Sequence, residues 1–115
     1  MSDDKFKITN YAQASDEAEL KKMEELLARD PESVPLLEWI AFMYYTSDKP
    51  QRGIELYSKL VDLDGENEAH HYYLANLQQK NHNIQQALKH WKEVLRINPT
   101  SKFSEKSQRL IEQYS

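Results

Sequence analysis

Apolar residues recur along most of the chain at intervals of three and four positions, with charged and amide residues between them. The segment 16–29 shows the pattern first, with apolar residues at Leu20, Met23, Leu26 and Leu27. This spacing gathers the apolar side chains on one face of an α-helix. The same pattern returns downstream, so the chain is predicted to consist of amphipathic helices with little or no strand.

The apolar pattern repeats with a period of 34 residues. Shifting the chain by this length aligns large apolar residues with large apolar residues, and a turn with a turn. The aligned positions are Leu20, Ile54 and Leu88; Met23, Tyr57 and Trp91; Leu26, Leu60 and Val94; Leu27, Val61 and Leu95; Asp30, Asp64 and Asn98; Pro31, Gly65 and Pro99. A fixed period of this length predicts stacked copies of one helical unit.

Helix-breaking residues separate the segments. Each aligned segment closes with Asp or Asn followed by Pro or Gly, a combination that ends helices. Asp48 and Pro50 suit the cap and first turn of a helix from about Pro50 to Asp62, because proline lacks the N–H that the first turn leaves unbonded. Residues 81–83 are expected to form the corresponding turn in the next unit.

Small residues recur in the same register as the large ones. Ala41 and Ala75 are one period apart, and so are Gly53 and Ala87. These positions predict the places where two helices approach most closely. The bulkier positions that accompany the alanines are Leu37, Ile40 and Tyr44 in one unit and His71, Leu74 and Gln78 in the next.

This arrangement resembles the tetratricopeptide-repeat (TPR) family, whose pattern is a bulky residue, a bulky-small pair and an aromatic, then a small residue, an aromatic and a closing proline. Full repeats fall at about 34–67 and 68–101. The departures are Gly65 at the closing proline, and His71 and Gln78 where bulky apolar or aromatic residues are usual. The resemblance implies an all-α, right-handed solenoid of helical hairpins, with two full repeats and an extra helix at each end.

The two ends of the chain carry incomplete units. Residues 16–29 correspond to the second helix of a unit whose first helix is missing or degenerate, and Ser15 suits the N-cap. A terminal helix at about 101–114 is expected to cover the last repeat. Its apolar side is formed by Phe103, Leu110, Ile111 and Tyr114. The expected TPR domain spans 15–115, after a segment 1–14 that is either disordered or packed into the groove of the solenoid.

In TPR proteins the first helices of the units line a concave groove that binds extended peptides or a partner's helix. The resemblance implies such a peptide-binding groove here. Its candidate residues are Glu38, Trp39, Phe42, Tyr45, Tyr72, Tyr73, Asn76 and Gln79, with Lys106 from the last helix. Five of them are aromatic, and rigid rings supply contact area at a small entropic cost. We therefore expect a protein-protein interaction module, an adaptor that binds a peptide or helix of a partner protein.

Some TPR proteins bind the C-terminal carboxylate of chaperone tails through lysine, arginine and asparagine side chains. Glu38 and Phe42 stand here where a lysine and an asparagine are expected. That form of binding is therefore not predicted. Asn76 and Lys106 remain a pair suited to a carboxylate or an acidic side chain.

Two alternatives stay open at this stage. An aromatic stripe at helical spacing also fits a buried core, with Phe6, Ile8 and Tyr11 covering Phe42 and Tyr45. The groove or an apolar end of the stack also fits weak self-association, which predicts a structural or assembly domain.

The amino-acid composition excludes some classes of binding partner. Among 115 residues, 19 are acidic and 15 are Lys or Arg, so the formal net charge is −4. A chain of this charge has no general attraction for phosphate backbones, so nucleic acid is not an expected partner. No segment approaches the roughly 18 apolar residues that span a bilayer. A soluble cytoplasmic protein without a membrane partner is expected.

Residues for catalysis or metal binding are few. The chain has no cysteine and only two glycines, which removes thiol chemistry and glycine-rich phosphate loops. His70 and His71 are adjacent and diverge by about 100° on a helix, while His82 and His90 lie on other segments. We therefore expect no enzyme activity, metal or cofactor, and we expect His71 to pack in the stack with a satisfied ring nitrogen.

Overall fold

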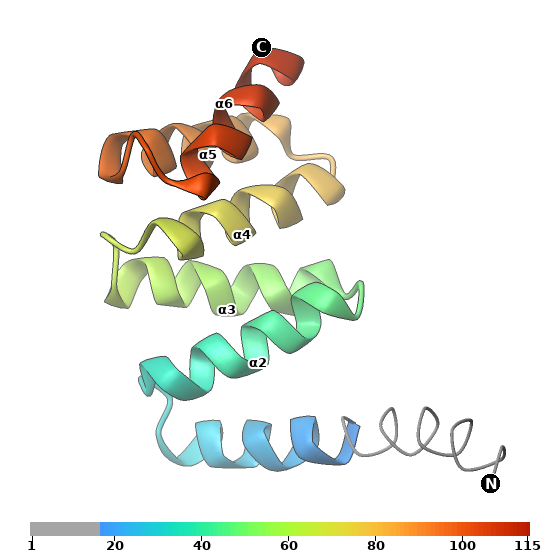
Figure 1. The fold of residues 1–115 in the computed structure, drawn as a ribbon. Coiled ribbons are helices and arrows are strands. Elements are labelled where there is room, and N and C mark those ends of the chain that lie inside the picture. Colours follow the sequence, from blue (N-terminus) through green and yellow to red (C-terminus); the bar gives the residue numbers. More distant parts are fainter. Residues whose placement is uncertain (1–16) are drawn as a thin grey trace, which may run out of the picture.

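A computed structural model describes residues 17–115 of the chain. Within this part it contains helices joined by short turns, as expected for an all-α protein. The helices are residues 17–29, α2 (Val34–Thr46), α3 (Pro50–Leu63), α4 (Glu68–Lys80), α5 (Ile84–Ile97) and α6 (Lys102–Tyr114) (Figure 1). The candidate N-cap Ser15 and the segment 1–14 lie outside the described residues.

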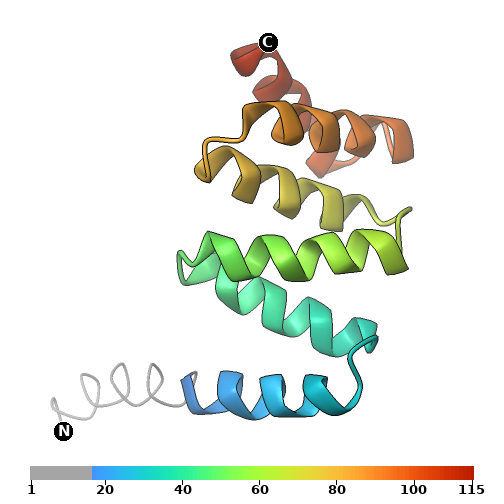
Figure 2. The same ribbon diagram turned by 180° about the vertical axis from the view of Figure 1, so that it is seen from behind.

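The helices form a stack in which each helix packs on the next one along the chain. α2 contacts α3, α3 contacts α4, α4 contacts α5, and α5 contacts α6; α4 also contacts α6. Views from the two sides show the same stack of helices, with residues 17–29 at one end and α5 and α6 at the other (Figures 1 and 2). Contacts are therefore made mainly between neighbouring elements, as in a solenoid.

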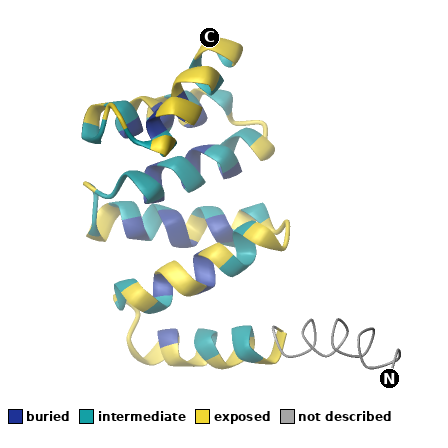
Figure 3. Ribbon diagram, in the orientation of Figure 1, coloured by how far each residue is buried: buried dark blue, intermediate teal, exposed yellow. Residues whose placement is uncertain are grey.

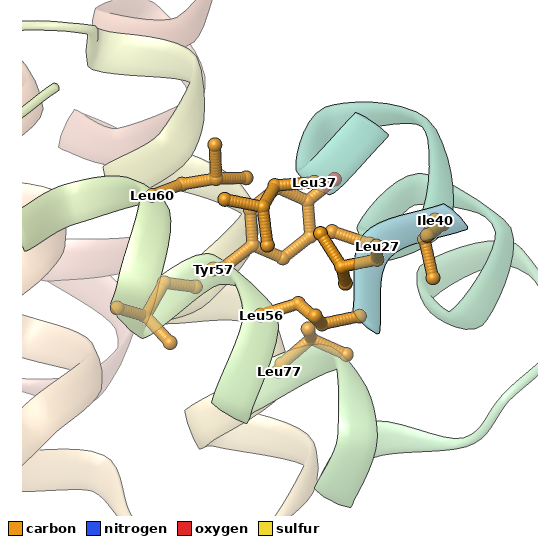
Figure 4. Close-up of a cluster of buried hydrophobic side chains, with 9 residues drawn as sticks. Leu27, Leu37, Ile40, Leu56, Tyr57, Leu60 and Leu77 are labelled. Atoms are coloured by element: carbon orange, nitrogen blue, oxygen red, sulfur yellow. The ribbon is translucent and has the colours of Figure 1, made fainter. Parts of the chain in front are cut away.

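The core runs through the stack as two adjoining clusters. The larger cluster joins residues 17–29 to α2, α3 and α4, and its buried members are Leu27, Leu37, Ile40, Ala41, Leu56, Tyr57, Leu60, Leu74 and Leu77 (Figure 4). The second cluster centres on Ala75, Ala87 and Trp91, with Leu110, Ile111 and Tyr114 of α6 packed against it. Buried positions occur on every helix of the described part (Figure 3).

The small residues occupy the closest helix contacts, as the repeat predicted. Ala41, Ala75 and Ala87 are completely buried. A β-carbon at position 53 would lie 2.8 Å from Cδ1 of Leu77, so α3 and α4 approach each other where Gly53 lacks a side chain. A larger residue at position 53 would displace Leu77, which is itself fully buried.

The turns between the two helices of each repeat share a left-handed residue. Asp48 has φ 59° and His82 has φ 62°, and these positions are one period apart. The N-cap of α3 is Lys49, without a side-chain capping bond, so the prediction that Asp48 caps this helix is wrong. Asp48 is needed one residue earlier, because short polar residues adopt positive φ more readily than most others.

Replacing His82 with glycine is expected to stabilise the protein by about 0.5–1 kcal/mol, because a side chain at positive φ strains the backbone and glycine does not. His82 is exposed, so little packing is lost. Urea denaturation followed by circular dichroism measures the change. The matched control is Asn83→Gly, since Asn83 has φ −106° and should gain nothing; equal stabilisation by both changes would contradict the explanation.

The last helix has a polar outer face. α2, α4 and α6 begin at Val34, Glu68 and Lys102, each 34 residues after the last, so α6 has the register of a first helix. The positions of α6 that correspond to the core residues of α2 are instead polar and exposed: Glu105, Gln108, Arg109 and Glu112. α6 therefore presents a solvated face at the positions where α2 packs on its neighbours.

Candidate binding site

The candidate groove residues lie on α2, α4 and α6, and their exposure differs. Trp39 and Phe42 are 41% and 44% exposed, whereas Tyr45, Tyr72 and Tyr73 are half-buried. Neither the fully exposed nor the fully buried arrangement of the five aromatic residues is therefore observed. The proposed covering residues of the N-terminal segment lie outside the described part of the chain.

Six aromatic rings from four helices form one continuous cluster, which we call the ring cluster. Its members are Phe42 and Tyr45 of α2, Tyr57 of α3, Tyr72 and Tyr73 of α4, and Phe103 of α6. Tyr73 is the hub, because its ring centre lies 4.9–5.8 Å from the centres of the other five rings. Such pairs stabilise each other beyond the area they bury, so the cluster is a preformed surface.

An open hollow of about 200 Å³ adjoins the ring cluster between α2 and the start of α4. Its lining is Glu38, Phe42, Tyr57, Ala69, His70 and Tyr73. Burial, followed by the neighbouring Tyr73, raises the pKa of Tyr57, so its phenol stays neutral. The hollow therefore combines aromatic walls with one carboxylate.

The carboxylate of Glu38 is held by a buried histidine. Nε2 of His70 lies 2.8 Å from Oε2 of Glu38; the side chain of His70 is 3% exposed and that of Glu38 is 46% exposed. A carboxylate oxygen accepts, so Nε2 of His70 donates. His70 thus orients Glu38 at the edge of the hollow.

Asn76 joins α4 to α2 and to α5. Its Nδ2 donates to the hydroxyl of Tyr45 at 3.0 Å, and its Oδ1 accepts from Nε1 of Trp91 at 3.0 Å. Both ends of the amide are therefore engaged within the protein. Its predicted role with Lys106 in holding a carboxylate stays a prediction, and ligand binding there would compete with these two bonds.

His71 is buried with both ring nitrogens bonded, as expected. Its Nε2 lies 2.9 Å from the carbonyl oxygen of Gly65, and its Nδ1 lies 3.0 Å from Nδ1 of His90. The carbonyl can only accept, so Nε2 of His71 donates; with a neutral His71, its Nδ1 accepts from Nδ1 of His90. The two histidines therefore replace the bulky apolar packing usual at position 71 with a polar link between α4 and α5.

This histidine pair makes stability depend on pH. Burial, then the neighbouring His71, lowers the pKa of His90 to about 4 from 6.5. Between these values the unfolded chain binds a proton that the folded chain does not, so this stabilisation is complete above pH 6.5 and is lost as the pH falls towards 4. Each pKa unit corresponds to about 1.4 kcal/mol, and solvent screening of the half-buried ring reduces the effect, so we expect a loss of about 1 kcal/mol between pH 7 and about pH 5.

The measurement is the free energy of unfolding in urea at the two pH values. His90→Asn is the matched control, because its amide donates to His71 but does not titrate in this range. The variant should lose less stability than the wild type on acidification. Equal losses in both proteins would contradict the assignment, since the other titrating groups are common to them.

Sequence reasoning missed four residues of the ring cluster and the hollow, namely Tyr57, Ala69, His70 and Phe103. The period placed Tyr57 in the core. It did not indicate that the same side chain also lines the hollow. Phe103 was placed on the apolar side of the last helix, yet it lies one period after Ala69, which lines the hollow. The period therefore held a signal for Phe103, whereas nothing in the sequence indicated the contact between His70 and Glu38.

The remaining candidates lie outside the ring cluster. Trp39 forms no aromatic pair with a described residue, although it is exposed on α2. Gln79 is half-buried on α4, and Lys106 is exposed on α6. Their predicted roles in peptide binding stay predictions.

Larger hollows of about 510, 470 and 370 Å³ lie elsewhere. The first contains Glu24, whose two carboxylate oxygens accept from Arg52, and the hydroxyl of Tyr44 donates to one of them. The Arg52 guanidinium lowers the pKa of Glu24, and its charge is already neutralised. The second lies along the polar face of α6, and the third has Tyr44 as its one aromatic lining residue. The smaller hollow differs from all three in having three aromatic side chains in its lining.

Comparison with known proteins identifies the repeat. Residues 71–101 match the model of a family described as tetratricopeptide repeat. The chain has the tetratricopeptide-repeat fold. Residues 71–101 contain the second helical pair, α4 from its fourth residue and all of α5. The departures at His71 and Gln78 therefore do not disrupt the TPR fold.

Solved structures share this TPR fold at low sequence identity. The chaperone SycD of Yersinia enterocolitica, in complex with a peptide of the translocator YopD, is 12% identical with a TM-score of 0.78, covering 93% of this chain and 85% of SycD. The first TPR of Spaghetti (RPAP3), bound to the HSP90 peptide SRMEEVD, is 16% identical with a TM-score of 0.76. The match covers 91% of this chain and 83% of the RPAP3 chain.

The MamA protein is a further structural neighbour. It is 20% identical with a TM-score of 0.71, covering 79% of this chain but 50% of MamA, so the TPR chain spans about half of MamA. No curated protein matches the sequence. Among the described residues, no helix has the length and apolar character needed to cross a membrane.

Proposed function

We propose that this TPR protein is a non-catalytic interaction module that binds a peptide or helix of a partner protein across the ring cluster. The observation that carries the proposal is the exposure of Phe42, 44%, at the open edge of a cluster whose other rings hold it in place. An exposed ring on a rigid base loses little entropy on binding, which favours its use as an anchor.

The structural neighbours support this proposal. SycD and the first TPR of RPAP3 are both described with bound peptides, and both have the fold of this chain. The proposed groove runs along α2 and α4, whose first-helix register corresponds to the groove helices of TPR proteins. Peptides bound there would contact Phe42 first and Tyr72 and Tyr73 beyond it.

A library of short random peptides selected on the full chain tests the proposal. Selected peptides, labelled with a fluorophore, are titrated against the wild type and against the double variant with Phe42→Ala and Tyr72→Ala. We expect at least about a tenfold loss of affinity in the double variant, because buried aromatic anchors dominate such interfaces. Circular dichroism and light scattering verify that fold and mass are unchanged.

The matched control is Leu63→Ala. Leu63 is 39% exposed on α3, so the change removes a similar exposed apolar group away from the ring cluster. Its affinity should equal that of the wild type. Peptides that bind the double variant as tightly as the wild type would contradict the groove assignment.

A further inference from the structure

The hollow beside the ring cluster has an incompletely paired carboxylate. Oε2 of Glu38 accepts from His70, whereas Oε1 makes no hydrogen bond with any residue in the range 17–115. His70 is 2% exposed and its Nε2 donates to Glu38, so this contact orients the carboxylate at the edge of the hollow. An oriented acceptor at the edge of a hollow is suited to a donor from outside the chain.

The walls of the hollow favour a positive charge. Phe42, Tyr57 and Tyr73 line it, and the faces of aromatic rings attract cations. None of the six lining residues is a lysine or an arginine, and with a neutral His70 no cation of the lining neutralises Glu38. An apolar occupant would desolvate this carboxylate without pairing it, and an acidic occupant would be repelled.

The size of the hollow limits the occupant to one side chain. Its volume of about 200 Å³ is below the roughly 300–1,000 Å³ of sites that enclose small molecules. A long unbranched side chain with a terminal charge fits, because its methylene groups can contact the rings while its charged end reaches Glu38.

We infer that this hollow is a specificity pocket for a lysine or arginine side chain of the bound peptide, an inference that rests on the proposed function. Glu38 pairs with the cation through Oε1, and Phe42 and Tyr73 flank the side chain. His70 uses one of the two lone pairs of Oε2, so Glu38 can accept from a lysine ammonium or from both arms of an arginine fork, and the pocket takes either residue. The pocket thus selects a basic residue, the opposite of a clamp for an acidic tail.

Sequencing the peptides selected from the random library gives the first test. Peptides that bind the wild type should share a lysine or arginine at one aligned position. Selection on Glu38→Gln, which keeps an acceptor for His70, should remove this preference. Glu112→Gln is the matched control, because it removes the same charge from the exposed outer face of α6 and should leave the preference intact.

A double-mutant cycle gives the second test. One selected peptide is compared with a copy in which the basic residue is replaced by norleucine, each titrated against the wild type, Glu38→Gln and Glu112→Gln. The charge should contribute about tenfold to affinity for the wild type, equivalent to about 1.4 kcal/mol. This factor should disappear in Glu38→Gln and persist in Glu112→Gln.

These experiments distinguish a failure of the pocket from a failure of the groove. If the Phe42 and Tyr72 double variant loses binding but the cycle gives a factor near one, or the peptides share no basic position, the pocket is refuted and the groove stands. If that double variant binds as tightly as the wild type, or no peptide is selected, both the groove and the pocket are refuted.

Discussion

Replacing Trp91 with alanine is expected to lower the free energy of unfolding by about 4 kcal/mol. Trp91 is completely buried in the second core cluster, where its ring stacks on Tyr114 with centres 5.7 Å apart. The change leaves a large cavity and removes the donor to Asn76, a bond that spans α4 and α5. Since domains of this size are stable by only about 5–15 kcal/mol, such a loss is severe.

Urea denaturation followed by circular dichroism measures this loss without relying on tryptophan fluorescence. Trp39→Ala is the matched control, because it removes the same side chain from a position that is 41% exposed. We expect a change below about 1 kcal/mol for the control. Similar losses for the two variants would show that Trp91 does not have the structural role assigned to it.

A chain that ends at Thr100, and so lacks α6, is expected to be less stable by about 3–5 kcal/mol. Leu110, Ile111 and Tyr114 pack on the second core cluster, and Phe103 packs on the ring cluster. Without α6, the apolar surface around Trp91 meets water. In a Trp39→Phe background, Trp91 is the remaining tryptophan of the two in the chain, and its emission should shift to longer wavelength in native buffer.

The corresponding control changes the outer face of α6 and leaves its inner face intact. Arg109→Ala removes an exposed ion pair with Glu105, which is expected to contribute less than about 0.5 kcal/mol. A truncated chain with the unfolding midpoint and Trp91 emission of the full chain would contradict the covering role of α6.

The proposed groove and the stability of the stack depend on largely separate residues. Core positions such as Trp91 hold the helices together, whereas Phe42 and Glu38 are exposed and bear little of the packing. Changes at the exposed positions should therefore alter binding with little loss of stability. This separation makes the proposed pocket testable with proteins that remain folded.

The binding site was predicted in part. Placement of the candidate residues on α2 and α4 followed from the period, because each unit presents the same face of its first helix. The carboxylate of Glu38 was noted as a departure from one known form of TPR binding, but its contact with His70 was not foreseen. That contact joins residues 32 positions apart, and the choice of hydrogen-bond partner depends on side-chain directions that periodicity does not specify.

The sequence by itself determined the all-α stack and most of the core. It did so because each TPR unit packs on its neighbours through the same positions, so one local pattern specifies the whole arrangement. Only the tertiary structure decided that Tyr73 joins five other rings, that His71 pairs with His90, and that Asp48 adopts a left-handed turn. These features depend on how neighbouring helices place particular side chains and backbone atoms in space, and spacing along the chain does not convey those distances.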